Sequence, residues 1–346
     1  MDDDMTTLPV LPVGKLPMEL LARVLGRYDS LDDRVIVGPG VGRDAAVLDF
    51  GDVNLVVKSD PITFPSDDSA LYLVSVNAND LACLGAVPRW LMVTALLPEG
   101  ATTSQMVESL FDDLTEACRQ HDITLIGGHT EITSGLERVL LIGTMLGEAR
   151  PDGLLMPGGA RPGDRLILTR PIAVEGTALV AREFSDELRM AFDGEFVERA
   201  ANLLVKPGIS IVDHARALLK TGGVTALHDP TEGGLATGLR EIAIASGCGA
   251  MVGRDLIPVL PETAMICAHL GVDPLGLLAS GSLLAAVRPE HVAEVVEIEW
   301  PDGTHPVVLG KLTPAERGFS MVSNGEAAPL PSFATDEFAR LLIERA

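Results

Sequence analysis

Residues 69–86 read SALYLVSVNANDLACLGA, and this stretch is apolar at helical spacing with no helix breaker before Gly85. The pattern predicts a buried helix over 69–86. Asn77 and Asp80 lie within it, and polar side chains that are buried need partners. A bound cation would offset the desolvation cost of an unpaired Asp80 carboxylate. We therefore expect Asp80 to be a functional acid.

Three further aspartates stand beside apolar segments in motifs marked by glycine or proline. The motifs are GVGRDAAV at 40–47 with Asp44, KSDP at 58–61 with Asp60, and HDPTEGGL at 228–235 with Asp229. Any one of these acids is explained by a turn or a helix cap. Together with Asp80, and placed in turns at the ends of elements, they favour a metal–phosphate site. Mg²⁺ takes oxygen ligands and bridges a few carboxylates to phosphate oxygens.

Two glycine pairs accompany these acids. Gly233 and Gly234 follow Asp229 and lead into a predicted helix, whose first N–H groups can receive phosphate oxygens. Gly127 and Gly128 come directly after a predicted strand at 123–126. We expect both pairs to line a ligand cleft between two domains. The chain has no Walker A motif and no Gly-x-Gly-x-x-Gly after a strand, which disfavours the common nucleotide-binding folds.

Length and composition predict two domains. A chain of 346 residues is long for one core, and its densest Pro/Gly stretch covers 150–164, so we place the domains at 1–157 and 158–346. The chain contains no run of 18 or more apolar residues, so no membrane-spanning helix is predicted. The N-terminus lacks the features of a secretory signal, so we expect a cytoplasmic protein with no membrane partner.

The net charge of −23 argues against a nucleic-acid partner, because such binding depends on Lys and Arg. A nucleotide would need a cation and local basic residues, for which Arg43, Lys58 and Arg89 are candidates. The four cysteines, which form no CxxC pair, are expected to be buried thiols; they are Cys83, Cys118, Cys248 and Cys267. The seven histidines form no pair at zinc-ligand spacing.

The order of predicted elements is mixed, which favours an α+β fold class over a doubly wound sheet. In the first half, strands are predicted at 35–37, 45–48, 53–57, 90–97, 123–126 and 139–146, and helices at 18–28, 69–86 and 103–121. In the second half, strands are predicted at 165–169, 283–287 and 306–309. Helices are predicted there at 174–184, 196–205, 209–219, 235–246 and 290–298.

The order of five motifs resembles the PurM/AIR-synthase-related ATP-binding superfamily. These are the three motifs quoted above, Asn-x-Asn-Asp-Leu-Ala-x-x-Gly-Ala-x-Pro at 77–88 and Gly-Gly-His-Thr-Glu at 127–131. Within the superfamily, the sequence around 229–247, Ile257-Pro-Val and Leu270-Gly-Val-Asp-Pro-Leu is most similar to the hydrogenase-maturation factor HypE. The resemblance implies a two-domain, PurM-like α+β architecture. It also implies a homodimer formed through the N-terminal sheet, and ATP held in the cleft.

The resemblance also implies roles for individual residues. Asp44, Asp60, Asp80 and Asp229 would be Mg²⁺ ligands, and Asp44, Asp80 and Asp229 would be catalytic. The nucleotide or substrate cleft would also include Lys58, Asn79 of the predicted helix, and residues of the glycine motifs, namely Gly42, Gly127, Gly128, His129 and Gly233. The shared chemistry is ATP-dependent phosphorylation that activates an amide or similar oxygen.

Departures from the family leave the substrate open. HypE ends in a cysteine that carries the carboxamide, whereas the last cysteine here is Cys267, so we expect the amide to come from a separate small molecule or protein. A phosphotransferase of the thiamine-monophosphate-kinase type is an alternative, but that family has Gly-Gly-Asp-Thr where this chain has Gly-Gly-His-Thr. The third alternative is a nucleotide-binding regulatory protein without turnover, which the four intact acids disfavour.

Overall fold

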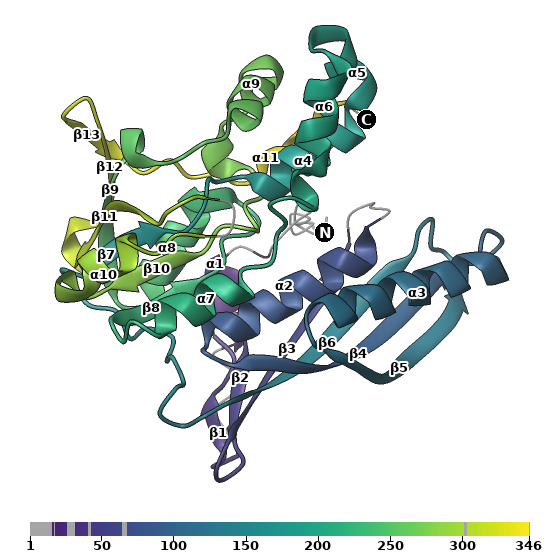
Figure 1. Ribbon diagram of the computed structural model, residues 1–346, viewed down its shortest axis with the longest axis horizontal. Coiled ribbons are helices and arrows are strands. Elements are labelled where there is room, and N and C mark those ends of the chain that lie inside the picture. The colour runs from purple at the N-terminus through teal and green to yellow at the C-terminus, as the bar shows by residue number, and fades with distance from the viewer. Residues whose placement is uncertain are drawn as a thin grey trace, which may run out of the picture.

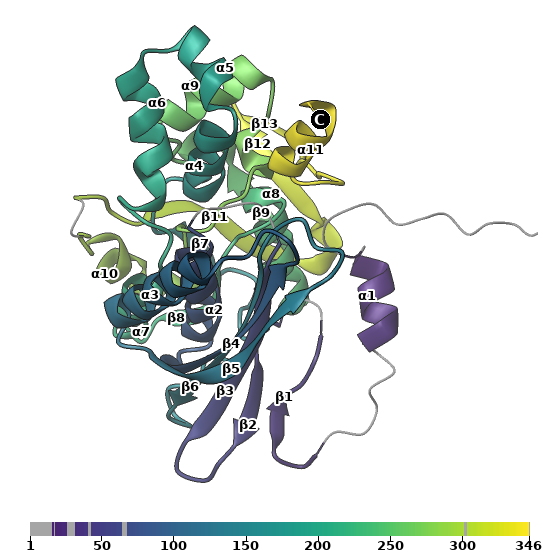
Figure 2. The same cartoon turned by 90° about the vertical axis from the view of Figure 1, so that its right-hand side faces the viewer.

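The structure is a computed structural model that describes residues 16, 18–25, 32–40, 43–63, 68–300 and 303–345. It contains two mixed sheets, each with helices packed beside it (Figures 1 and 2). None of the helices in these ranges is long and apolar enough to span a membrane.

The first sheet has six strands in the order β1-β2-β3-β6-β4-β5. The strands are β1 (Val35–Val37), β2 (Ala46–Asp49), β3 (Asn54–Ile62), β4 (Val87–Pro98), β5 (Thr124–Thr133) and β6 (Leu140–Ala149). Among the described strands of this sheet, only β4 and β5 pair in parallel. Helices α2 (Ser69–Cys83) and α3 (Ser104–Gln120) lie on one side of this sheet, and α1 (Met18–Leu25) stands apart from it (Figure 2).

The second sheet has seven strands in the order β13-β12-β9-β11-β7-β10-β8. They are β7 (Arg165–Leu168), β8 (Val224–His228), β9 (Cys248–Gly253), β10 (Leu284–Val287), β11 (Val307–Pro314), β12 (Phe319–Ser323) and β13 (Glu326–Pro329). The helices of this half are α4 (Val174–Glu183), α5 (Ser185–Ala191), α6 (Gly194–Ala201), α7 (Val212–Leu219), α8 (Gly234–Ala245), α9 (Pro261–Leu270), α10 (Val292–Val296) and α11 (Glu337–Arg345). The predicted α+β class is confirmed.

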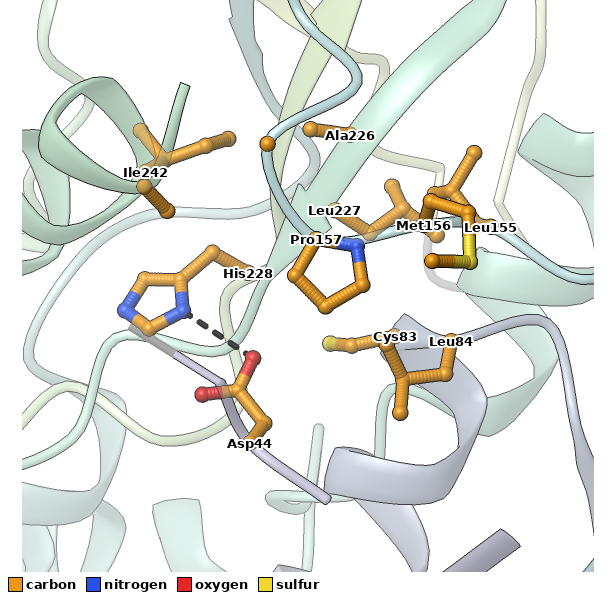
Figure 3. A pocket seen from close by; sticks show the side chains of 12 residues that line it. Asp44, Cys83, Leu84, Leu155, Met156, Pro157, Ala226, Leu227, His228 and Ile242 are labelled. Atoms are coloured by element: carbon orange, nitrogen blue, oxygen red, sulfur yellow. Dashed lines mark hydrogen bonds and ion pairs between the residues drawn. The ribbon is translucent and has the colours of Figure 1, made fainter. Parts of the chain in front are cut away.

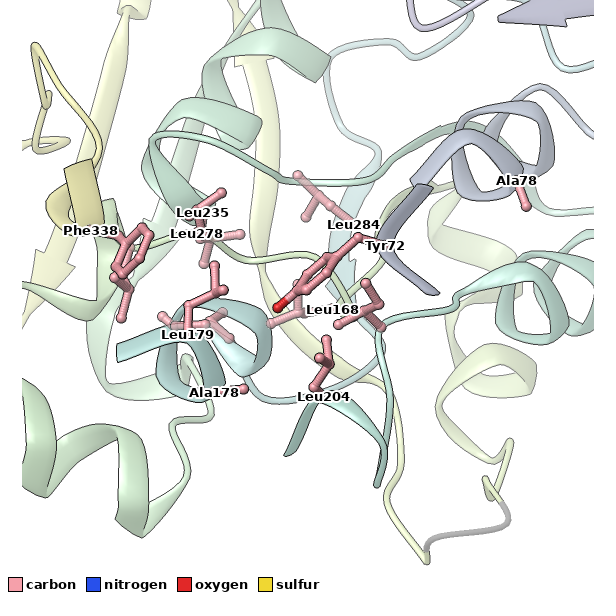
Figure 4. Packing of buried hydrophobic residues seen from close by; sticks show 14 of the residues in the cluster. Tyr72, Ala78, Leu168, Ala178, Leu179, Leu204, Leu235, Leu278, Leu284 and Phe338 are labelled. Atoms are coloured by element: carbon pink, nitrogen blue, oxygen red, sulfur yellow. The ribbon is translucent and has the colours of Figure 1, made fainter. Parts of the chain in front are cut away.

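Helix α2 joins the two halves. Its apolar positions are buried on nearly all sides, because the helix packs against the first sheet and also against the second half. Figure 4 shows Tyr72 of α2 among Leu168, Leu179 and Leu284, which come from β7, α4 and β10. The predicted buried helix is therefore confirmed. It ends at Cys83, and Gly85 then adopts a positive φ of 77°.

The glycine pair at 127–128 does not follow a strand, so that prediction was wrong. Both residues lie inside β5, which continues to Thr133. Their φ values of 142° and 146° suit only glycine, and the β4–β5 register shifts between Leu91 and Met92 beside them. A Cβ on Gly128 would lie 1.8 Å from the backbone oxygen of Val93, so the missing side chain is what lets the two strands meet.

The expected position of Asp60 in a turn was also wrong. Asp60 and Pro61 lie within β3, whose pairing with β6 continues through Ile62. The KSDP motif resembles a turn because proline usually ends a strand, but here β3 pairs in regular register with β6 through Ile62, and its pairing with β2 ends at Val57, before Pro61.

The Pro/Gly-rich segment 150–164 packs against both halves. The Leu155 amide donates to the carbonyl of Leu84 at the end of α2 (3.0 Å), and the Gly163 amide donates to the carbonyl of Leu312 in β11 (3.0 Å). The boundary between residues 157 and 158 lies in this segment, between β6 and β7, and stays a prediction.

Candidate active site

Lys58 brings two of the four aspartates together. Lys58 and Asp60 are two residues apart on β3 and so share a face of the strand, and this face meets Asp80 of α2. The Lys58 Nζ atom lies 2.7 Å from Asp80 Oδ2 and 3.3 Å from Asp60 Oδ2. A strand and a helix from adjacent stretches of sequence thus form a compact group of charges.

Charge and burial oppose each other in this group. Burial would lower the pKa of Lys58, but the charges of Asp80 and Asp60 outweigh it and raise that pKa, so the side chain remains an ammonium ion. Burial raises the pKa of Asp80 to about 7; the Lys58 ammonium opposes this rise, and the charge of Asp44 adds to it. The described acids here outnumber the basic groups, which favours a cationic ligand.

Asn79 connects α2 to the second half. Its side chain is fully buried, and its Nδ2 donates to Asp229 Oδ2 and to the carbonyl of Ile209, both at 2.9 Å. Its Oδ1 accepts the amide of Ile211 at 2.9 Å. Both the nitrogen and the oxygen of the Asn79 side-chain amide are thus hydrogen-bonded to other residues of the protein. Asn79 thus orients Asp229, and its expected place in the nucleotide or substrate cleft stays a prediction.

Asp229 lies directly after β8 and is almost fully buried. Its Oδ2 is held by Asn79, while no hydrogen bond reaches Oδ1 from any residue in the described ranges. Burial raises the pKa of Asp229 well above its usual range, and the charge of Asp80 adds to the rise. A buried carboxylate oxygen of this kind needs a proton or a bound cation.

Asp44 meets the second half through His228, the last residue of β8. The Nδ1 atom of His228 lies 3.4 Å from Asp44 Oδ2, and its Nε2 atom lies 2.9 Å from Glu241 Oε2 on α8. Burial would lower the pKa of His228, but the charges of Asp44 and Glu241 raise it well above the usual value. His228 therefore links acids from both halves.

A small cavity lies beside Asp44 and His228. Its volume of about 20 Å³ is enough for one water molecule. Figure 3 shows Asp44, His228, Cys83 and Pro157 around it, together with apolar side chains. Burial, followed by the charge of Asp44, raises the pKa of the Cys83 thiol, so this cysteine stays protonated and is a poor nucleophile.

The glycine-motif residues that the structure describes lie on β5 and before α8, and their place in the cleft stays a prediction. Gly127, Gly128 and His129 are on β5, an edge strand separated from β3 by β4 and β6, and His129 contacts Glu131 (3.1 Å). Gly233 precedes α8, as expected, but its amide donates to Asp336 Oδ2 (2.8 Å). Gly42 lies outside the described residues.

Sequence reasoning missed two side chains at this site. In the sequence, His228 stands out only as the residue before Asp229, and Glu241 only as part of the stretch similar to HypE. Glu241 is an acid on the apolar helix α8, the same kind of signal that drew attention to Asp80 on α2. The side chains of both residues are at least four-fifths buried.

The acids do not form a ready metal cage. In the ranges that the structure describes, no three His, Cys, Asp or Glu side chains are arranged to hold a metal ion. Lys58 instead supplies the nearest positive charge to Asp60 and Asp80.

Comparison with known proteins identifies the family. The models for the N-terminal and C-terminal domains of AIR synthase related proteins match residues 42–149 and 161–323. A putative hydrogenase expression/formation protein of Methanocaldococcus jannaschii is 28% identical, with 88% of this chain and 90% of the relative covered. The carbamoyl dehydratase HypE of Rhizobium leguminosarum bv. viciae is 30% identical, with 80% and 79% covered.

Solved structures agree with this assignment. The crystal structure of the hydrogenase maturation protein HypE in complex with ATP superposes with a TM-score of 0.69, at 23% identity and with 91% of each chain covered. The expected two-domain architecture and the likeness to HypE are confirmed. With its motifs, its two sheets and its relatives in agreement, this chain belongs to the AIR synthase-related protein family and is similar to the HypE carbamoyl dehydratases within it.

Proposed function

We propose that this protein is a HypE-like enzyme that uses Mg·ATP to phosphorylate, and so activate, the oxygen of an amide or carbamoyl group. The observation that carries the proposal is the group of Asp60 and Asp80 around Lys58, with Asp44 and Asp229 close enough to influence the pKa of neighbouring groups. Relatives named carbamoyl dehydratase and a relative solved with ATP support the same chemistry.

The donor set fits Mg²⁺ in its chemistry. All four proposed ligands, Asp44, Asp60, Asp80 and Asp229, offer carboxylate oxygens, and Asp229 Oδ1 is buried without a hydrogen bond from the described residues. Mg²⁺ is usually held by one or two carboxylates plus substrate phosphates and water, rather than by a cage made only of protein. Because phosphate and water oxygens supply the remaining ligands, the four aspartates need not surround the ion by themselves, which fits a Mg²⁺ ion that binds together with ATP.

The bound Mg²⁺ would neutralise the charge that develops as the γ-phosphoryl group is transferred. The protein's own groups have distinct tasks. Lys58 adds a fixed positive charge beside Asp60 and Asp80, Asn79 orients Asp229, and His228 contacts Asp44. Apolar side chains of both halves line the small cavity beside Asp44 and His228 and limit access of water there.

The carrier of the amide group is proposed to be a separate molecule. All four cysteines of the printed sequence are buried, and burial raises the pKa of each thiol. None of these four is therefore suited to present a carbamoyl group. A carbamoylated small molecule or protein side chain would supply the oxygen that ATP activates.

Replacing Asp80 by asparagine tests the proposed site. We expect Asp80→Asn to abolish Mg-dependent ATP binding in calorimetry, because it removes the buried charge beside Lys58. The fold should persist, since Lys58 keeps Asp60 as a partner. In the wild type, EDTA should remove nucleotide binding, and ATP turnover should rise when a carbamoylated substrate is added.

Asp164→Asn is the matched control. Asp164 is also buried, but its Oδ2 accepts the amide of Arg161 (2.9 Å) and the hydroxyl of Thr225 (2.7 Å) within the second half. This variant should melt at a lower temperature and bind Mg·ATP as the wild type does. The proposal fails if Asp80→Asn, per folded molecule, retains wild-type affinity.

A further inference from the structure

His228 is held between two acids that come from different halves of the molecule. It is only 6% exposed, and its two ring nitrogens face Glu241 of α8 and Asp44, which is 184 residues away in the sequence. Each nitrogen therefore has a carboxylate partner. One partner belongs to the same half as His228, and the other belongs to the proposed metal–phosphate site.

The orientation of the ring is set by α8. Glu241 holds Nε2 at 2.9 Å, the shorter of the two contacts. On the same helix, Gly238 leaves room for the ring and for Pro230: a Cβ at Gly238 would lie 3.3 Å from His228 Cδ2 and 2.8 Å from Pro230 Cβ. The helix thus packs directly on His228. The ring has little freedom to rotate, so its Nδ1 atom remains directed towards Asp44 in the first half.

Asp44 lies just before β2 and follows the glycine-containing motif at 40–42. Its contact with Nδ1 measures 3.4 Å, which is long for a hydrogen bond. Such contacts between functional groups often tighten when the substrate binds. Since ligating carboxylates depend on outer partners for their orientation, a rigid imidazole at this point is suited to aim the Asp44 carboxylate.

We propose that His228 is a positioning residue that aims the Asp44 carboxylate of the first half into the proposed Mg·ATP site, while Glu241 holds the His228 ring. This inference rests on the proposed function. It adds a chain of contacts, Glu241–His228–Asp44, through which the second half controls an acid of the first half.

Two substitutions separate the two ring nitrogens. The side-chain amide nitrogen of asparagine takes the place of Nδ1, and that of glutamine takes the place of Nε2. His228→Asn therefore keeps the donor towards Asp44, whereas His228→Gln keeps the donor towards Glu241. Both variants lose the imidazole, so a purely structural role predicts similar effects.

Calorimetric titration with Mg·ATP measures the difference. We expect His228→Gln to bind about 10- to 100-fold more weakly than the wild type, as is typical when a residue that orients a ligating group is removed. His228→Asn should bind much more tightly than His228→Gln. Glu241→Ala should weaken binding of Mg·ATP as well, since the His228 ring then loses its carboxylate partner at Nε2.

His214→Gln controls for the loss of a buried imidazole. His214 is 3% exposed on α7, and its ring packs against Trp300 with 4.2 Å between the ring centroids. This variant should keep wild-type affinity. Equal losses in His228→Asn and His228→Gln, or wild-type affinity in both, would overturn the inference.

Hydrogen exchange on the ligand-free protein gives a second readout that does not depend on nucleotide. Amides of residues 44–49 should exchange faster in His228→Gln than in His228→Asn, because only the latter retains the donor to Asp44. If the wild type does not bind Mg·ATP, the proposed function fails. If the wild type binds and the two variants show no difference in exchange or in affinity, only the role of His228 fails.

Discussion

Lys58 illustrates how one residue makes an acidic site possible. Asp80 is buried on an apolar helix, where an isolated carboxylate would be strongly destabilising. The Lys58 ammonium at 2.7 Å offsets part of that penalty, and Asp60 gives Lys58 a second partner. The remaining acids leave an excess of negative charge, which a hard cation would balance.

Glu175 is another buried acid, and it makes the stability of the protein depend on pH. It is 2% exposed at the start of α4, and its Oε2 accepts the amide of Ser280 (3.3 Å). Burial raises its pKa from 4.5 to about 7; Ser280 opposes the rise and the charge of Asp336 adds to it. The folded protein thus holds this proton more tightly than the unfolded chain.

We expect Glu175→Gln to stabilise the protein at alkaline pH. The contribution of a group with a raised pKa is fully present below pH 4.5 and is lost as the pH rises through 7. Glutamine stays neutral, so at pH 8 the variant should exceed the wild type by about 3 kcal/mol in free energy of unfolding. Near pH 4.5 the gap should close.

Urea denaturation at the two pH values measures this effect. The exposed residue Gln105 provides the control, since Gln105→Asn changes no titratable group and should differ from the wild type equally at both pH values. A Glu175→Gln variant that gains no stability between pH 4.5 and pH 8 would contradict the prediction.

Among the secondary-structure elements, α2 and β5 are held in place by their neighbours in two different ways. Helix α2 buries its apolar surface against both sheets and reaches the second half through Asn79 and Tyr72. Strand β5 depends on close contact between backbones, because Gly127 and Gly128 adopt conformations that other residues rarely take. The two glycines differ in the space around them.

We expect Gly128→Ala to destabilise the protein more than Gly127→Ala. Both positions have φ near 145°, so alanine adds strain of about 1–3 kcal/mol at either. At Gly128 the new Cβ would also lie 1.8 Å from the Val93 carbonyl oxygen, whereas a Cβ at Gly127 would meet no atom of the described residues within 4 Å, apart from its chain neighbours. Gly128→Ala must therefore displace β5 from β4.

Urea denaturation of the two variants measures the difference, and each serves as the control for the other. Equal losses in free energy of unfolding would mean that backbone strain alone sets the cost, and would argue against the close approach of the two strands.

At the scale of the whole molecule, the first sheet leaves apolar side chains exposed. Its helices α2 and α3 lie on one side (Figure 2), while Met92 of β4 and Ile126 and Ile132 of β5 are 43%, 51% and 61% exposed. Strand β5 is also an edge strand with nearly all its residues exposed. Apolar surface next to an open edge favours association.

We expect the protein to form a homodimer through this sheet. Light scattering at micromolar concentration should give twice the chain mass of 36.5 kDa. Ile132→Lys should shift the population towards the monomer, because a charge would be buried in the interface. Met190→Lys is the control: Met190 is 84% exposed on α5 of the second half, and this variant should remain dimeric. A monomeric wild type would contradict the prediction.

Features that depend on neighbouring residues can be predicted from the amino-acid sequence alone. The helix over 69–86, the α+β class and the turn from Asp229 into α8 were predicted correctly, because apolar periodicity and Gly/Pro positions act over a few residues. The order of the acid motifs was also enough to indicate the family. The motifs at Asp60 and Gly127 each suggested a turn. In the structure both residues lie within strands, because each is paired with a neighbouring strand.

Which of these residues come into contact depends on how the elements pack. Asn79 and Asp229 are 150 residues apart, and Asp44 and His228 are 184 apart, so no spacing in the sequence could pair them. Their contacts form when α2 and the segment before β2 pack against the second half. That packing depends on burial of apolar surface across the whole chain, which places polar groups according to the geometry of the packed elements rather than their distance in sequence.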